Sequence, residues 1–165
     1  MSNLFRRDQE FPASLAIHRG IAQEQVQTEQ IHQKVRVMTI ETISTNRSHG
    51  GTQGVYKHNS RATGTEMTFS VFVPDHAPGA KLPVIWYLSG LTCTHANVTE
   101  KGEFRAACAE LGLIFVAPDT SPRGEGVADD AEGAYDFGLG AGFYVNATEA
   151  PFASHYRMRD RKSVV

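Results

Sequence analysis

The residues best suited by type and order to do chemistry are Ser89-Gly90-Leu91-Thr92-Cys93. They directly follow the apolar run from Val84 to Leu88, with no polar spacer between the two. A glycine just past a buried strand lets the backbone turn sharply, so that the next amide N–H groups can point into a cleft. Such donors suit an oxyanion, although an ordinary strand-to-helix turn with a buried Cys93 has the same spacing.

Cys93 is a second candidate, as a nucleophile. A thiol nucleophile needs a nearby base, and the spacing alone does not bring His95 to face it. The seven histidines show no HxxxH or HxH spacing, and the acidic residues at 129–132 lack the alternation of a calcium loop. The GLGAG run at 138–142 lacks GxGxxG spacing and follows no predicted strand. These patterns predict neither a metal site nor a dinucleotide site.

The elements that must position the turn begin near Met38. Alternating patterns predict antiparallel strands at 38–46, 54–60 and 66–74, the last of them half-buried. The unbroken apolar run at 84–88 predicts a strand covered on both faces, followed by a helix at 100–111 that ends at Gly112 and a second buried strand at 113–117. The fold class is therefore α/β, in which antiparallel strands lead into a parallel strand-helix-strand unit. The turn then lies at the carboxyl end of a strand, where open α/β sheets bind ligands.

Composition and charge restrict the classes of partner. With 165 residues and a net charge of −2, the chain has no electrostatic reason to bind nucleic acid or an anionic membrane. No apolar run approaches the roughly 18 residues of a membrane span, so we expect a cytoplasmic protein. Residues 1–37 are rich in Gln and Glu and are expected to be an extension, loosely structured or partly helical, ahead of a domain at 38–165. The Gly-rich segment 120–142 is too long for a mere connector.

Several motifs in order resemble one known family. The runs SGLTCT, APDTSPRGEG, YDFGLGAGFYV and HYRM, within about residues 38 to 160, closely resemble the amino-terminal half of S-formylglutathione hydrolases, which are α/β-hydrolases of the esterase D family. The resemblance implies serine-dependent thioester hydrolysis of the small-molecule substrate S-formylglutathione, without metal or organic cofactor, and it allows homodimers among intact members. It also implies that the backbone N–H of Leu91 belongs to the oxyanion hole and that Cys93 is a thiol near the active site.

The sequence departs from this family in one decisive respect. No GxSxG nucleophile elbow occurs, and none of the Ser, Asp and His residues of the triad is matched. We therefore expect a truncated α/β-hydrolase domain that is inactive alone and insoluble or molten, with the strand at 113–117 left as an apolar edge. Two alternatives stay open: a non-catalytic α/β-hydrolase-like binding module, and an enzyme that depends on Cys93.

Overall fold

The computed structural model describes residues 39–162, so the expectation for residues 1–37 lies outside the described residues. Within this range there are five strands, three α-helices and one 3-10 turn. The strands are β1 (Ile40–Ser48), β2 (Gly51–Asn59), β3 (Glu66–Pro74), β4 (Val84–Trp86) and β5 (Ile114–Pro118). The helices are α2 (His95–Lys101), α3 (Arg105–Leu111) and α4 (Met158–Lys162), and the 3-10 turn η1 is Phe152–Ser154.

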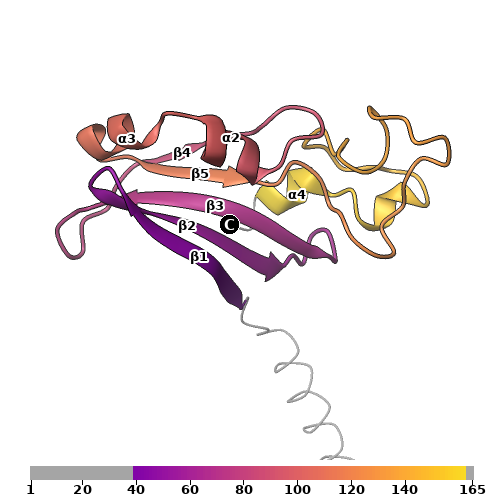
Figure 1. The fold of residues 1–165 in the computed structure, drawn as a ribbon. Coiled ribbons are helices and arrows are strands. Elements are labelled where there is room, and N and C mark those ends of the chain that lie inside the picture. Colours follow the sequence, from indigo (N-terminus) through magenta and orange to yellow (C-terminus); the bar gives the residue numbers. More distant parts are fainter. Residues whose placement is uncertain (1–38, 163–165) are drawn as a thin grey trace, which may run out of the picture. The chain divides into compact units, whose positions relative to one another are not determined.

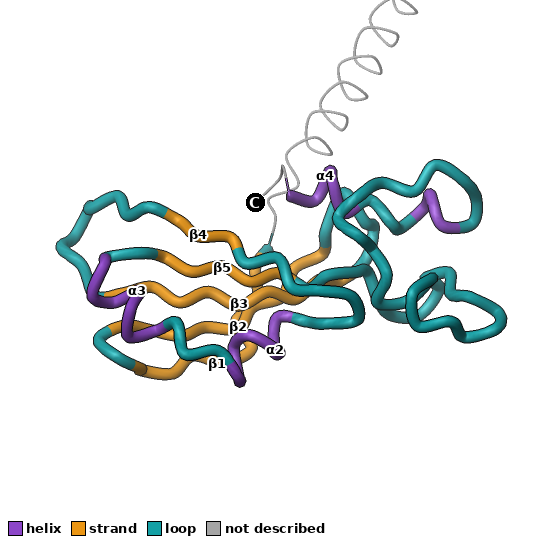
Figure 2. The backbone as a smooth tube through the Cα atoms, turned by 90° about the horizontal axis from the view of Figure 1, so that it is seen from above, coloured by secondary structure: helices purple, strands orange, loops and turns teal. Residues whose placement is uncertain are grey.

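The strands form one mixed sheet in the order β1-β2-β3-β5-β4 (Figures 1 and 2). The pairs β1–β2, β2–β3 and β3–β5 are antiparallel, whereas β4 and β5 are parallel, with Ile85 opposite Phe115. The chain returns from β4 to β5 through α2 and α3. This is the architecture predicted from the sequence, antiparallel strands leading into a parallel strand-helix-strand unit.

The single crossover helix predicted at 100–111 is in fact two short helices. Thr94 caps α2 in a capping box with Asn97, and α2 ends at Gly102, whose N–H donates to the carbonyl of Val98. A β-carbon at Gly102 would lie 2.7 Å from that carbonyl oxygen, so the break accepts only glycine. α3 ends at Gly112 in the left-handed conformation, as predicted.

The core lies between the sheet and the layer of α2 and α3 (Figure 1). Phe72 of β3 and Phe115 of β5 are buried there, and the ring of Phe104 stacks on Phe115 at a centroid distance of 3.9 Å. β3 is buried on both faces rather than on one, because Phe72 faces the helices while Met67 is buried on the opposite side. Leu111, the last residue of α3, is 67% exposed and lies outside this core.

β4 differs most from its sequence-based prediction. Its run was expected to be covered on both faces, yet each residue from Val84 to Leu88 is 40–47% exposed. β5 was expected to become the apolar edge, but it lies between β3 and β4 and is largely buried. The apolar edge of the sheet is therefore β4, because the crossover places β5 on the β3 side of β4 and leaves nothing described on the other side.

The segment that follows β5 crosses the carboxyl end of the parallel pair (Figure 2). Two of its stretches pair with each other: the N–H of Ala147 donates to the carbonyl of Tyr156, and the N–H of Met158 donates to the carbonyl of Val145. This pairing starts α4 next to β3 and β5. None of the helices formed by residues 39–162 is long and apolar enough to cross a membrane.

Candidate active site

The turn at Ser89 to Cys93 follows β4 at the carboxyl end of the parallel pair. Its register is set by the N–H of Tyr87, which donates to the carbonyl of Val116 at 2.8 Å. Beyond this point the chain leaves the ladder: the N–H of Thr92 donates to the carbonyl of Gly140 at 3.0 Å, and that of Cys93 donates back to Gly90 at 3.2 Å. Within residues 39–162 the Leu91 N–H donates no backbone hydrogen bond. Leu91 is thus outside the sheet ladder.

Arg123 fastens the turn from the long segment after β5. Its Nη2 donates to the carbonyl oxygens of Thr92 and Cys93, each at 3.2 Å, and its Nη1 donates to the carbonyl of Ser121. The hydroxyl of Thr120 also donates to the Cys93 carbonyl in a short hydrogen bond. These bonds fix the peptide planes that follow Thr92 and Cys93. The peptide plane that carries the Leu91 N–H is held instead by the hydrogen bond from the Cys93 N–H to the Gly90 carbonyl.

Gly140 closes on the turn from the other side. It has φ of +90°, and a β-carbon there would lie 3.2 Å from the Cα of Thr92 and 3.5 Å from Nη2 of Arg123. A side chain at this position would separate the segment from the turn and strain the backbone. The glycine at position 140 of the GLGAG run therefore lets the backbone of this segment lie against the backbone of the turn at Thr92.

Asp119 joins the end of β5 to the start of α2. Its Oδ1 accepts hydrogen bonds from the backbone N–H of His95 at 2.8 Å and pairs with His95 Nδ1 at 2.6 Å. Both side chains are largely buried. His95 is engaged with Asp119, and in the described part of the chain no hydrogen bond joins its ring to Cys93. A Cys93–His95 catalytic pair therefore has no support in the geometry.

Tyr144 anchors the same turn at its first residue. Its hydroxyl donates to the carbonyl of Ser89 at 2.8 Å. Burial raises the pKa of Tyr144 to about 12, against a lowering by the positive charge of Arg161. The phenol therefore stays protonated at any physiological pH and is a permanent donor to the turn.

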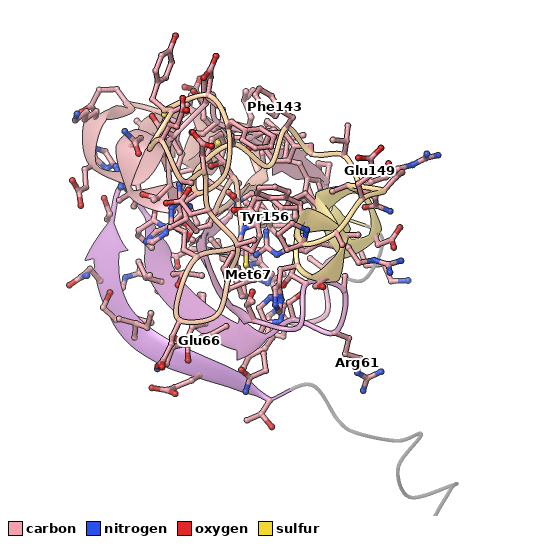
Figure 3. All side chains as sticks on the ribbon, turned by 90° about the vertical axis from the view of Figure 1, so that its right-hand side faces the viewer. Arg61, Glu66, Met67, Phe143, Glu149 and Tyr156 are labelled. Carbon is pink, nitrogen blue, oxygen red and sulfur yellow. The ribbon has the colours of Figure 1, made fainter. Side chains whose placement is uncertain are left out.

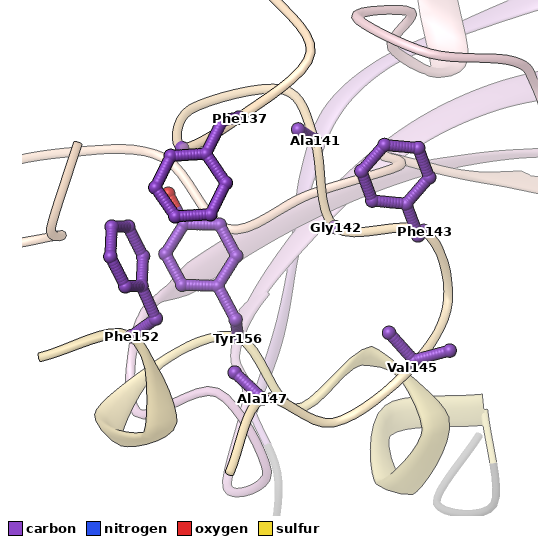
Figure 4. Close-up of a pocket in the computed structure, with 9 residues that line it drawn as sticks. Phe137, Ala141, Gly142, Phe143, Val145, Ala147, Phe152 and Tyr156 are labelled. Atoms are coloured by element: carbon purple, nitrogen blue, oxygen red, sulfur yellow. The ribbon is translucent and has the colours of Figure 1, made fainter. Parts of the chain in front are cut away.

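A largely apolar pocket of about 270 Å³ lies further along this segment (Figure 4). Three aromatic rings form one wall: Phe137 packs on Phe152 at 4.7 Å between centroids, and Phe152 on Tyr156 at 5.5 Å. Ala141, Gly142, Phe143 and Val145 supply other lining groups. The pocket can hold an apolar group, but it offers little to polarise a carbonyl.

The sequence reasoning singled out Leu91 and Cys93, and both lie in one turn at the carboxyl end of β4. It missed the residues that hold this turn, namely Thr120, Arg123, Gly140 and Tyr144, and it missed Asp119, which holds the start of α2. All five stand within the runs APDTSPRGEG and YDFGLGAGFYV that carried the resemblance, so the matched motifs were the available signal.

The comparisons with known proteins agree with this geometry. The model of the Esterase family, described as "Putative esterase", matches residues 60–163, which is more than half of the chain. The chain belongs to the esterase family. The S-formylglutathione hydrolase of Paracoccus denitrificans is 59% identical over 121 residues, and that of Mus musculus is 46% identical over the same length. The esterase chain covers 43% of each relative, and 73% of the chain takes part in each match.

A solved structure supports the fold as well. The S-formylglutathione hydrolase from Agrobacterium tumefaciens is 52% identical and superposes with a TM-score of 0.72, over 75% of this chain and 44% of that chain. The mixed sheet is therefore an incomplete α/β-hydrolase fold, as predicted. The chain spans less than half the length of the curated relatives that it matches.

Proposed function

We propose that this chain carries the oxyanion-hole half of a serine thioester hydrolase that acts on S-formylglutathione. The observation that carries the proposal is the Leu91 amide: it stands outside the ladder, at the carboxyl end of a parallel strand, in a turn held by Arg123, Thr120 and Gly140. Identities of 46–59% to proteins named S-formylglutathione hydrolase support the choice of substrate.

The proposed chemistry is acyl transfer. A serine hydroxyl, deprotonated by the triad histidine, attacks the thioester carbonyl, and the Leu91 N–H donates to the oxygen that becomes negatively charged. The C–S bond then breaks, glutathione leaves as the thiol with the proton from the histidine, and water hydrolyses the formyl ester of the serine to formate. One preorganised donor of this kind is worth roughly 2.7–4 kcal/mol of the barrier. The serine, aspartate and histidine of the triad have no counterpart among the 165 residues, since no GxSxG occurs. Cys93 is proposed as a neighbouring thiol with no part in bond making, and no cofactor is involved.

The chain alone is therefore expected to be inactive. The purified protein should not hydrolyse S-formylglutathione or an activated ester above the buffer rate, because a donor without a nucleophile has no anion to stabilise. Turnover that a serine-directed reagent abolishes would contradict this expectation. Glutathione titrated against the chain separates a retained binding module, which would bind it specifically, from half of an enzyme.

The role of Leu91 is tested in a covalent chimera, in which the matched part of the Paracoccus denitrificans enzyme is replaced by the corresponding residues of this chain. Leu91→Pro removes the N–H, and the expected result is a loss of kcat of about 10²- to 10³-fold. Leu91→Ala keeps the N–H and should keep kcat within a few-fold. An unchanged thermal midpoint excludes unfolding as the cause. Equal kcat in the two folded variants would overturn the assignment of Leu91.

A further inference from the structure

The turn that carries the Leu91 amide runs directly into α2, and the start of that helix is attached to one carboxylate. Oδ1 of Asp119 accepts from the backbone N–H of His95 at 2.8 Å and pairs with His95 Nδ1 at 2.6 Å. Because an ionised carboxylate only accepts hydrogen bonds, Nδ1 is the ring nitrogen that carries the proton. The side chains of His95 and Asp119 are 18% and 15% exposed, so water competes little for this contact.

Asp119 is itself fixed to the sheet through its backbone. It directly follows β5, which lies between β3 and β4. Its N–H donates to the carbonyl of Thr68 on β3 at 3.0 Å, and its carbonyl accepts from Nη1 of Arg161 on α4 at 3.2 Å. The position of the Asp119 backbone therefore does not depend on α2, and its carboxylate is a fixed point to which His95 is attached.

A short path leads from His95 back to the Leu91 amide. The N–H of Cys93, two residues before His95, donates to the carbonyl of Gly90 at 3.2 Å. That carbonyl lies in the same rigid peptide plane as the Leu91 N–H. The position of Cys93 therefore determines the direction in which the Leu91 N–H points.

Thr92 makes this path sensitive to the start of α2. Its φ is +63°, a rare conformation for a β-branched residue, which persists only where the surrounding contacts enforce it. Gly140 and Arg123 contact the backbone of Thr92 directly. The contact between His95 and Asp119 instead holds the chain that follows Thr92, so its loss allows the backbone there to relax.

The other end of the turn is anchored independently of α2. The Tyr144 hydroxyl donates to the carbonyl of Ser89 at 2.8 Å. Tyr144 and the preceding Phe143 have φ of +54° and +47°, and Figure 3 shows Phe143 on this segment, above Met67 of the sheet. The turn thus extends between two anchors, one on the segment after β5 and one at the end of β5 itself.

We propose that His95 and Asp119 are positioning residues for the Leu91 N–H. They act through the hydrogen bond from Cys93 to Gly90, and neither touches the reacting atoms. This inference rests on the proposed function, in which the Leu91 N–H donates to the oxyanion.

The effect of the pair is local to the start of α2. One turn further along this helix, the hydroxyl of Thr99 lies 2.7 Å from that of Ser70 on β3. In α3, Nε of Arg105 donates to the side chain of Gln53 on β2 at 3.1 Å. The two helices are therefore expected to stay on the sheet when the His95 ring is replaced, and only the first residues of α2 are released.

The first test uses the full 165-residue chain and needs no activity. His95→Leu removes the Nδ1 donor, whereas the matched control His95→Asn keeps an N–H donor close to the position of Nδ1. Hydrogen exchange at the Cys93 amide, measured by NMR, is expected to speed up about tenfold in the leucine variant and less than about twofold in the asparagine variant. Exchange at Tyr87, whose N–H donates to Val116 in the ladder, should stay within about twofold in both, which reports that the sheet is intact.

The second test uses the covalent chimera with the Paracoccus denitrificans enzyme and S-formylglutathione as substrate. His95→Leu is expected to lower kcat roughly 10- to 10²-fold with little change in KM, because a misdirected donor is lost to the transition state alone. His95→Asn should keep kcat within a few-fold. In an Asp119→Ala background His95→Leu should lower kcat by less than about twofold more, since the ring then has no acceptor through which to act.

Three results would each overturn the inference: unchanged exchange at Cys93 in His95→Leu, equal kcat in the leucine and asparagine variants, or a full further loss of kcat in the Asp119→Ala background. A change confined to KM would make His95 a substrate-binding residue and would overturn it as well. A chimera that hydrolyses no S-formylglutathione counts against the proposed function, whereas the exchange at Cys93 still decides whether the pair fixes the turn.

Discussion

Arg161 carries a charge that the fold buries without a full set of partners. It is 3% exposed, and burial lowers its pKa to about 10, well below the usual value for a guanidinium, despite the attraction of Asp119. Nη1 donates to the Asp119 carbonyl at 3.2 Å and Nη2 to the Thr68 carbonyl at 3.4 Å, while Nε has no hydrogen-bond partner within the described chain. A shift of this size corresponds to about 3 kcal/mol against the charged form in the folded state.

Arg161→Met is therefore expected to stabilise the fold. Methionine keeps an unbranched apolar side chain and carries no charge, so the desolvation cost of about 3 kcal/mol is removed from the folded state. The Asp119 carbonyl loses a donor, which costs about 1–2 kcal/mol, whereas the Thr68 carbonyl still accepts from the Asp119 N–H at 3.0 Å. The net gain expected in the free energy of unfolding is about 1–2 kcal/mol.

The assay is urea unfolding of the dilute chain, followed by the fluorescence of Trp86, the one tryptophan in the sequence. Arg159→Met is the matched control, since Arg159 lies in the same helix, is exposed, and should change stability by less than about 0.5 kcal/mol. A midpoint for Arg161→Met that is equal to or below that of the unchanged chain would refute the view that desolvation dominates at this site.

Three further predictions concern the buried His58, the turn contact of Gly140 and the two cysteines. Burial and the nearby Arg161 lower the pKa of His58 below 6.5. The unfolded chain therefore takes up a proton before the folded chain does, and the free energy of unfolding should fall as the pH drops below 6.5. Urea midpoints measured from pH 7.5 to 5 test this, and His58→Phe should flatten the pH profile. Gly140→Ala places a β-carbon at φ +90° near Thr92 and should lower the free energy of unfolding by about 1–3 kcal/mol in the same urea assay. Gly79→Ala is the control for the effect of φ alone, because Gly79 also has a positive φ but has open space around it. Cys93 is partly exposed, whereas Cys108 is buried with a pKa raised by burial, so iodoacetamide followed by mass spectrometry should label Cys93 first and Cys108 only in urea.

The strand pattern could be predicted because it depends on local alternation and on turns. β1, β2, β3 and β5 all lie within a few residues of their predicted positions, and Gly112 caps α3 as expected. Burial could not be predicted in the same way. The apolar run from Val84 to Leu88 is typical of a strand with neighbours on both sides. The sequence analysis did expect an apolar edge, but it assigned that edge to the strand at 113–117, because a local pattern does not give the order of the strands in the sheet.

The break between α2 and α3 shows a different limit. A helix pattern from 100 to 111 tolerates one internal glycine, so Gly102 alone does not announce a break. The break follows from tertiary packing: Arg105 donates to the Thr99 carbonyl and to the side chain of Gln53 on β2, which fixes the start of α3 against the sheet. Contacts at a separation of 52 residues are not visible in a local pattern.

The candidate site was only half accessible to sequence reasoning, for a similar reason. Leu91 and Cys93 could be chosen because they directly follow a strand, whereas the donors that fix their turn arrive from 27 to 55 residues further along the chain, through Thr120, Arg123 and Tyr144. Each of these bonds ends on a backbone carbonyl, which accepts from a residue of almost any identity at the receiving position. Only the donor residues, whose side chains make the bonds, are constrained in type and can be recognised in the sequence.

The orientation of the turn from Ser89 to Cys93 is set by residues of the described chain. Gly140, Arg123, Thr120 and Tyr144, all residues of the described chain, make contacts that orient the turn. The orientation of the Leu91 amide therefore depends on residues of the described chain itself, as the proposed oxyanion hole requires if no reorganisation is to accompany the reaction.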